Sequence, residues 1–171
     1  MDLATLQDLY VDELKDLYSA ENQILKALPR MIKKASHREL KRAFTTHERQ
    51  TRQQVKRLER IFKSLGESPR GKKCKGMEGV IADGTELMKE KAAPDVMDAG
   101  LISAAQHVEH YEIAGYGTVR TYAEQLGLGE HVTLLEQTLQ EEKETDQLLT
   151  NLAVGAINLE AAEEDDEEDE G

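Results

Sequence analysis

Five carboxylates and one histidine stand at helical positions where the surrounding pattern calls for apolar side chains. These residues are Glu21, His47, Glu109, Glu112, Glu142 and Asp146. A buried carboxylate without a partner is costly, and several that face one another repel unless cations neutralise them. A site rich in carboxylates with one imidazole suits iron or manganese better than zinc or copper. The sequence therefore predicts two divalent metal ions, Fe or Mn, among these side chains.

The spacing of apolar residues places these polar positions on four long helices. In chain order they interrupt the apolar stripe of the first helix (Glu21), the second (His47), the long fourth segment (Glu109 and Glu112) and the last helix (Glu142 and Asp146). Each interruption falls near the middle of its helix. Antiparallel packing of the helices would therefore bring the polar side chains to a similar height.

Each interruption taken alone also has a simpler explanation. The alternatives are a carboxylate directed to solvent (Glu21), a hydrogen-bonded core histidine (His47), a surface ion network with His107 or His110 (Glu109 and Glu112), and a solvated acidic face (Glu142 and Asp146). Basic residues that could neutralise the carboxylates fall largely outside the stripes. The coincidence of four interruptions at matched heights favours one shared site.

Composition and apolar spacing indicate an all-α protein. Charged residues make up 33 % of the 171 residues and aromatic residues only 4 %, which suits long helices better than sheets. Two helical hairpins are predicted, joined by a long crossover that contains a short extra helix. Ser36 and Glu39 form a predicted capping box for the second helix. A four-helix bundle with one such crossover is the ferritin-like topology, whose core houses metal sites.

Most of the formal net charge of −12 comes from the C-terminal end of the chain. Residues 160–171 hold nine acidic side chains, so we expect a ferritin-like helical bundle over residues 1–159 and a disordered acidic tail over 160–171. The bundle itself is nearly neutral, and its basic cluster, residues 70–75, lacks interleaved aromatic residues. We therefore expect no nucleic-acid partner. The tail could engage a basic partner, although a solvated tail is the simpler interpretation.

The sequence shows no feature of a membrane or secreted protein. No apolar stretch approaches the roughly 20 residues that span a bilayer. The segment Met1–Tyr10 has neither the basic start nor the apolar run of a signal peptide. Cys74 is the single cysteine, so an intrachain disulfide is impossible. We expect a soluble, cytoplasmic protein without a membrane partner.

Four segments resemble the YciE/YciF-type ferritin-like family. They are LYSAE (17–21), KCKGMEG (73–79), VEHYEIAGYGT (108–118) and EEKETD (141–146). The motif around Tyr111 is the most specific of them. The resemblance implies a homodimeric, cytoplasmic, stress-associated bacterial protein with a rubrerythrin-like bundle and a di-metal centre. It implies no established biochemical activity.

The resemblance also assigns residues, and here one helix departs from the family pattern. It matches the family's carboxylate positions in the first, third and last bundle helices to Glu21, Glu109, Glu112, Glu142 and Asp146. In the second helix, family members often carry an acid and a His where this chain has Gln50 and Gln54, while His47 and Thr51 are kept. Because Gln brings no charge, the second metal position is in doubt.

Two functions of different classes remain open. One is a metal-binding oxidative-stress protein that reacts with peroxide or dioxygen, in which Tyr18, Tyr111 and Tyr116 could serve as nearby donors, although core packing also explains each. The other is a non-catalytic structural or interaction module that has lost part of the metal site, as Gln50 and Gln54 suggest. Whether the protein is an enzyme stays open. Iron storage needs a hollow cage, and no pattern here indicates shell-forming interfaces.

Overall fold

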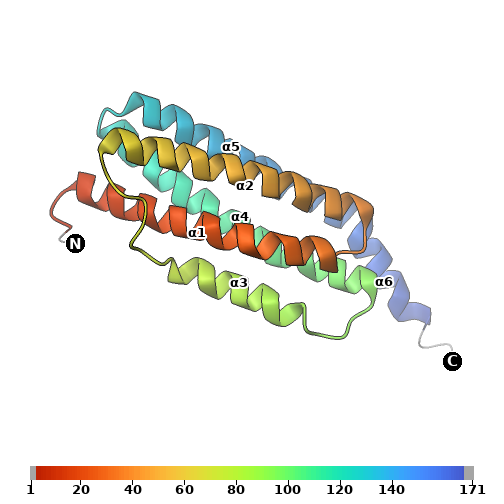
Figure 1. The fold of residues 1–171 in the computed structure, drawn as a ribbon. Helices are drawn as coiled ribbons and strands as arrows, with labels where there is room; N and C mark the ends of the chain where they lie inside the picture. Colours follow the sequence, from red (N-terminus) through yellow and green to blue (C-terminus); the bar gives the residue numbers. More distant parts are fainter. Residues whose placement is uncertain (1–2, 168–171) are drawn as a thin grey trace.

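The computed structural model describes residues 3–167, which fold almost entirely as helices (Figure 1). The elements are α1 (Leu6–Lys34), α2 (Arg38–Leu65), α3 (Lys75–Leu87), α4 (Pro94–Gln125), α5 (Gly129–Leu152), the π-helical turn η1 (Ala153–Ile157) and α6 (Asn158–Glu167). No strand occurs over these residues. Within the same part of the chain, none of the helices combines the length and apolarity needed to cross a membrane.

Helices α1, α2, α4 and α5 form a four-helix bundle. Each packs against two others, since α1 contacts α2 and α4 while α5 contacts the same two helices. The hairpins α1–α2 and α4–α5 are joined by a crossover over residues 66–93, which carries α3 on the outside of α1 and α4 (Figure 1). This ferritin-like topology confirms the predicted all-α four-helix bundle with a short extra helix in the long crossover.

A polar layer divides the apolar core of the bundle into two clusters. The layer consists of buried side chains from all four bundle helices, namely Glu21, His47, Thr51, Gln54, Glu109, Glu112 and Glu142. The cluster on one side of the layer includes Ile24, Leu28 and Met77, and we call it the α3-side cluster. The cluster on the other side includes Leu14 and Leu58. Tight apolar packing above and below keeps the polar layer away from water.

The predicted start of the second helix is wrong by one residue. His37, not Ser36, is the N-cap of α2, and its Nδ1 accepts the backbone N–H of Glu39 at 3.3 Å. The backbone N–H groups of Ser36 and His37 donate to the buried carboxylate of Asp98 on α4, at 2.8 Å and 2.6 Å. A contact with a distant helix therefore decides where α2 begins.

The C-terminal segment differs from the sequence prediction. A disordered tail was predicted from residue 160, whereas α6 continues to Glu167 and packs against α4. Ile157 is fully buried just before α6, while Leu159 is 59 % exposed. The side chain of Ile157 therefore anchors the start of α6 to the bundle. Residues 168–171 of the predicted tail lie outside the described residues.

Candidate metal centre

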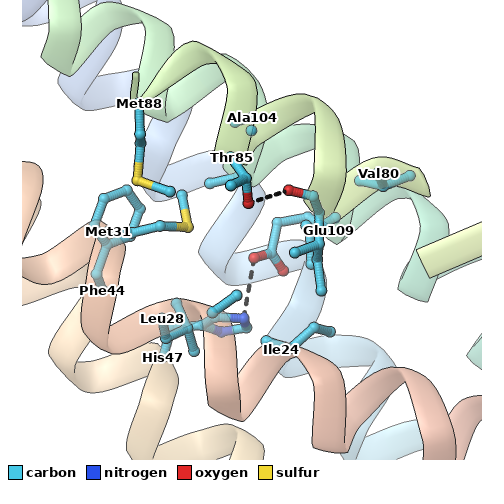
Figure 2. A pocket seen from close by; sticks show the side chains of 15 residues that line it. Ile24, Leu28, Met31, Phe44, His47, Val80, Thr85, Met88, Ala104 and Glu109 are labelled. Carbon is cyan, nitrogen blue, oxygen red and sulfur yellow. Dashed lines mark hydrogen bonds and ion pairs between the residues drawn. The ribbon is translucent and has the colours of Figure 1, made fainter. Parts of the chain in front are cut away.

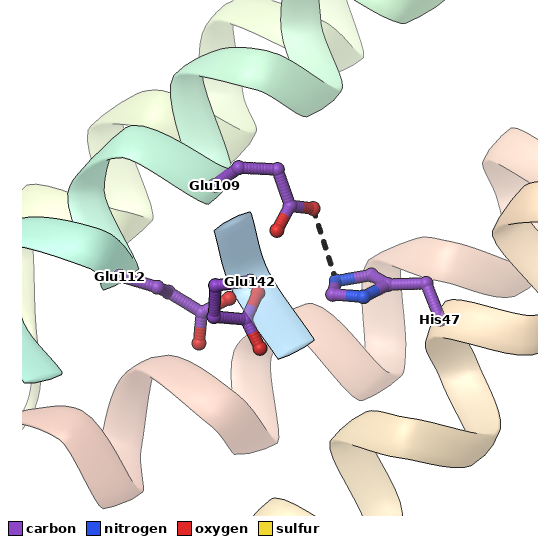
Figure 3. Close-up of side chains that lie close together, drawn as sticks. All are labelled: His47, Glu109, Glu112 and Glu142. Atoms are coloured by element: carbon purple, nitrogen blue, oxygen red, sulfur yellow. Dashed lines mark ion pairs between the residues drawn. The ribbon is translucent and has the colours of Figure 1, made fainter. Parts of the chain in front are cut away.

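His47, Glu109, Glu112 and Glu142 converge in the polar layer (Figure 3). One potential ligand atom of each side chain, a ring nitrogen or a carboxylate oxygen, lies within 4.8 Å of the others. The four residues come from α2, α4 and α5, and none is more than 2 % exposed. Glu109 and Glu112 share one face of α4 because residues three apart are neighbours on a helix. Three helices thus bring a nitrogen and three carboxylates into one dry volume.

Glu21 adds a fourth carboxylate from α1. Its side chain is fully buried, and its Oε1 accepts a hydrogen bond from the phenol of Tyr116 on α4. Its other oxygen, Oε2, has no hydrogen-bond partner. Tyr116 is also fully buried, so this bond is formed away from water. The phenol therefore fixes the orientation of the Glu21 carboxylate and leaves one oxygen free.

The imidazole of His47 faces the carboxylate of Glu109. Nε2 of His47 lies 3.1 Å from Oε1 of Glu109, the contact drawn as a dashed line in Figure 3. The pair is close but does not have the geometry of a hydrogen bond, and both ring nitrogens of His47 are without a hydrogen-bond partner. An imidazole placed this way in a dry core is available to a further partner.

Gln54 points into the polar layer, and two carboxylates fix its amide. Its Nε2 donates to Oε1 of Glu142 and, at 3.1 Å, to Oε2 of Glu141. Glu141 is in turn held by Arg57, whose two terminal nitrogens each lie 2.7 Å from one of its oxygens. The carbonyl oxygen Oε1 of Gln54 is buried and without a partner. The amide therefore presents an unused acceptor to the site.

Unpartnered polar atoms are concentrated in this layer. Among the side chains of residues 3–163, eight buried nitrogen or oxygen atoms have no hydrogen-bond partner, and they belong to Glu21, His47, Gln54, Glu109, Glu112 and Glu142. Buried polar groups in folded proteins are nearly always hydrogen-bonded, because an unpaired group loses its hydrogen bonds to water and gains none within the protein. Such a concentration at one place needs a specific physical reason.

Burial and mutual repulsion shift the proton affinities of these carboxyls. Burial, reinforced by the charge of Glu142, raises the pKa of Glu21 to about 8. The same two causes, in the same order, raise the pKa values of Glu109 and Glu112 well above the usual range. Burial, followed by the charge of Glu21, also raises the pKa of Tyr116, so its phenol keeps the proton that it donates. Without cations, the folded protein therefore favours protonated carboxyls in this layer.

The donor set is chemically suited to divalent cations. Four ionised carboxylates balance the charge of two such ions, and the unpartnered atoms include the imidazole nitrogens of His47 and the amide oxygen of Gln54 as neutral donors. Carboxylate and carbonyl oxygens with one imidazole match the preferences of iron and manganese. Metal binding would convert the repelling, unpartnered groups into ligands. The polar layer is thus a candidate metal centre.

The structure does not bring Asp146 into this cluster. Its Oδ1 accepts the amide of Gln106 at 3.1 Å, and its Oδ2 lies 3.2 Å from Nε2 of the exposed His110. On α5 the buried face continues from Glu142 to Thr145, one residue earlier than Asp146. A rotation of about 100° per residue along a helix places Asp146 between α4 and α5 at the surface. We therefore leave Asp146 out of the candidate ligands.

Of the three tyrosines considered from the sequence, one touches the site. Tyr116 bonds Glu21, whereas Tyr18 donates to Glu59 at 3.2 Å on the bundle surface. Tyr111 donates to Asp16 at 3.1 Å and lies beside the thiol of Cys74. The sequence did not reveal the contacts of Gln54 with Glu141 and Glu142. The sequence did place Gln54 on the buried face of α2 and two successive acids, Glu141 and Glu142, on α5, and this was the one pattern that could have indicated the contacts.

Comparisons with known proteins identify the family. The family described as "Domain of unknown function (DUF892)" matches residues 5–162 of this chain. The chain is 41 % identical to Protein YciF of Escherichia coli (strain K12) over 162 residues, which cover 94 % of this chain and 98 % of YciF. The crystal structure of the E. coli stress protein YciF matches with a TM-score of 0.87 and 42 % identity, over 91 % of this chain and 98 % of that one.

Two further solved structures have the same fold. YcfI from Rhodopseudomonas palustris matches with a TM-score of 0.85 and 43 % identity, over 87 % of this chain and 95 % of that one. A protein from Xanthomonas campestris pv. campestris shares the fold at 23 % identity, with a TM-score of 0.75 over 94 % of this chain and 98 % of its own. The predicted resemblance to YciE/YciF-type proteins is confirmed, and the chain belongs to the DUF892 family as a relative of YciF.

Proposed function

We propose that this protein binds two divalent metal ions, iron or manganese, in the polar layer of its bundle. The observation that carries the proposal is the set of eight buried, unpartnered ligand atoms on six facing residues. Buried repulsion of this kind is tolerated only if protons or cations neutralise it. The residues that would hold the ions are Glu21, His47, Gln54, Glu109, Glu112 and Glu142.

The surrounding residues would orient these ligands. Bound iron or manganese would supply one-electron redox chemistry within a site that excludes bulk water. Tyr116 holds one oxygen of Glu21, which leaves Oε2 to face the site. Arg57 holds Glu141, and Glu141 fixes the amide of Gln54 together with Glu142. Partners of this kind around the ligands tune both the affinity and the position of a metal.

The physiological role follows by analogy with a relative. E. coli YciF is described as a stress protein. We extend this role to the present chain and propose that it acts in the oxidative or general stress response, in the cytoplasm and as a homodimer. Its similarity to YciF along nearly the whole chain supports the extension.

Metal titration tests the proposal. Metal-free protein should bind about two equivalents of Mn(II), or of Fe(II) under anaerobic conditions, in isothermal titration calorimetry. Glu112→Gln removes one charge from the centre of the site and should lower the affinity at least about tenfold. Asp146→Asn, a matched change outside the cluster, should leave it unchanged. Less than about 0.2 equivalents of iron plus manganese after reconstitution would contradict the proposal.

The second candidate is a non-catalytic structural or interaction module. Gln54, an uncharged residue in the ring of buried carboxylates, favours it, and YcfI of R. palustris carries a provisional description as a structural protein. A module of this kind needs no metal. Glu109→Gln combined with Glu142→Gln should then raise the melting temperature of the protein, because buried repulsion is relieved. Mn(II) should leave the melting temperature of the wild-type protein unchanged.

A further inference from the structure

An apolar cavity lies beside the polar layer, on the side of α3 (Figure 2). Its volume is about 30 Å³, and side chains from α1, α2, α3 and α4 line it. Only three of its 15 lining residues have polar side chains: His47, Thr85 and Glu109. We call it the α3 cavity. It places an apolar compartment directly against two of the candidate metal ligands.

The two charged or titratable residues stand at the inner end of the α3 cavity. Figure 2 shows the imidazole of His47 and the carboxylate of Glu109 facing each other there, with the side chains of Leu28 and Ile24 close by. Both ring nitrogens of His47 and Oε2 of Glu109 are buried and without hydrogen-bond partners. A molecule that occupies the cavity therefore meets unused ligand atoms at its inner end.

The crossover helix α3 forms the outer wall of the cavity. Val80 and Thr85 of α3 contribute, as does Met88 at its C-terminal end, and all three are only partly buried. Helix α3 packs closely on α4, since a Cβ built at Gly84 would lie 3.2 Å from Cβ of Ala104. The α3 cavity therefore lies between α3 and the polar layer.

The size and lining of the α3 cavity select its occupant. A cavity needs about 10–15 Å³ to hold one water molecule, so about 30 Å³ admits a molecule of two or three heavy atoms and excludes an acyl chain. The single hydroxyl on the wall, Thr85 Oγ1, already donates to the carbonyl oxygen of Ile81 at 2.9 Å. Away from the His47–Glu109 end the wall offers no free hydrogen-bond partner, so water or hydrogen peroxide would lose hydrogen bonds in that part of the cavity, which costs free energy.

We propose that the α3 cavity binds dioxygen and delivers it to the metal centre at the His47–Glu109 end. The proposal rests on the proposed function, because dioxygen has a reaction partner there only when the polar layer holds a redox-active ion. Dioxygen is small, uncharged and apolar, so it enters such a cavity without losing hydrogen bonds. The crossover helix thereby gains a role, as the wall of the gas-binding compartment.

Dioxygen itself is the probe of the first experiment, carried out on metal-free protein. Because dioxygen is paramagnetic, it speeds the NMR relaxation of methyl protons near the sites that it occupies. The methyl groups of Ile24, Leu28 and Ala105, which line the α3 cavity, should show a larger effect than the equally buried methyl groups of Leu58 and Ile61. Equal effects in the two sets would overturn the proposal.

Filling the cavity supplies a matched pair of variants. Ala105→Leu places three additional carbon atoms at the cavity wall and should abolish the excess relaxation, while Ala114→Leu, on the exposed face of the same helix, should retain it. Ala27→Leu fills the cavity from α1 and replaces Ala105→Leu if that variant does not fold. Excess relaxation that persists in a folded, filled variant would overturn the proposal.

The second experiment uses protein loaded with Fe(II). The rate at which it consumes dioxygen should fall several-fold in Ala105→Leu, whereas the Fe(II) affinity and the rate with hydrogen peroxide should stay as in the wild-type protein. An unchanged rate with dioxygen would contradict the delivery role. Failure of the wild-type protein to bind iron would instead overturn the proposed function, and the metal-free relaxation experiment would still report on the cavity.

Discussion

Gln54 is held between two carboxylates that leave its amide one favourable orientation. A flip of the amide would bring its oxygen against the oxygens of Glu141 and Glu142, which now accept from its Nε2. The free carbonyl oxygen therefore stays directed at the polar layer, where it can serve as an uncharged metal ligand. The sequence indicated only that Gln54 weakens one metal position by lacking a charge. Its geometry shows that it still offers a donor atom.

A negative charge at position 54 should change the stability of the metal-free protein and its affinity for metal in opposite directions. Gln54→Glu introduces a further carboxylate beside Glu141 and Glu142. We expect it to lower the melting temperature of the metal-free protein and to raise the Mn(II) affinity, because a cation gains a charged ligand where the apo protein gains repulsion. Calorimetric titration and thermal melting measure the two effects. Gln53→Glu, on the exposed face of α2, is the control and should change neither.

The raised pKa of Glu21 makes the stability of the metal-free protein depend on pH. A carboxyl with a pKa of about 8 when folded, against its ordinary 4.5, binds more protons in the folded state than in the unfolded state between these values. The free energy of unfolding therefore falls as the pH rises through this window. Glu21→Gln removes the titrating group and keeps an acceptor for the phenol of Tyr116.

Urea unfolding in the presence of a chelator measures this effect. At about pH 8.5 the Glu21→Gln variant should be more stable than the wild-type protein by several kcal/mol, and the gain should shrink towards about pH 5. Glu109 and Glu112 contribute the same sign in both proteins, and the loss of the Glu21 charge also lowers their pKa values, so the difference reports Glu21 together with its repulsion of these two carboxyls. A gain that is independent of pH would contradict the account.

Asp146 shows why single positions escape sequence analysis. Glu142 and Asp146 are one turn apart, and the apolar stripe of α5 was predicted to include both. The structure instead buries Thr138, Glu142 and Thr145, a face rotated slightly from the predicted one. The periodicity of apolar residues locates the middle of a buried face well and its edges poorly, and Asp146 lies at such an edge.

Helix α3 depends on glycines for its close approach to α4. A Cβ at Gly76 would lie 2.6 Å from the ring of Tyr111, which is itself held by Asp16 and Cys74. A Cβ at Gly79, in the same helix, would meet no atom within 4 Å. Two glycines one turn apart in the same helix therefore have opposite steric surroundings.

Substitution by alanine at these two glycines should have opposite effects. Gly79→Ala should stabilise the protein by about 0.5–1 kcal/mol, because alanine reduces the conformational entropy of the unfolded chain. Gly76→Ala should destabilise it, because the ring of Tyr111 cannot move away without breaking its hydrogen bonds. Urea denaturation of both variants measures the difference. Equal effects would show that α3 does not pack as described.

The helices were predictable, whereas the contacts that fix their ends were not. Apolar spacing reports which face of each helix is buried, and it therefore gave the four bundle helices, the short α3 and their order. The start of α2 was misassigned because Asp98, far along the chain, accepts the N–H groups of Ser36 and His37. The extension of α6 was missed because an acidic segment offers no periodic apolar signal.

At the scale of the whole molecule, a layer of buried carboxyl groups crosses the centre of the four-helix bundle. The two apolar clusters on either side supply the burial that stabilises the fold, and the layer between them opposes it by desolvation and repulsion. A ligand that binds only the folded state stabilises it. Cations that bind the polar layer should therefore determine much of the stability of this protein.

Thermal melting checks this expectation directly. At a free Mn(II) concentration about 100 times the dissociation constant, binding stabilises by about 2.7 kcal/mol. For a domain of this size such a gain raises the melting temperature by about 5–10 °C. Glu112→Gln should lose most of this increase, and chelation should reverse it in the wild-type protein. A melting temperature that is insensitive to Mn(II) would favour the structural module.

A crystal structure of reconstituted protein, with anomalous data collected at the iron and manganese edges, tests the central claim most directly. The account predicts two anomalous peaks within the polar layer, ligated by side chains from α1, α2, α4 and α5. It also predicts that the amide oxygen of Gln54 and the imidazole of His47 face these ions. Peaks at the surface beside Asp146 and His110, or an empty polar layer after full reconstitution, would contradict it.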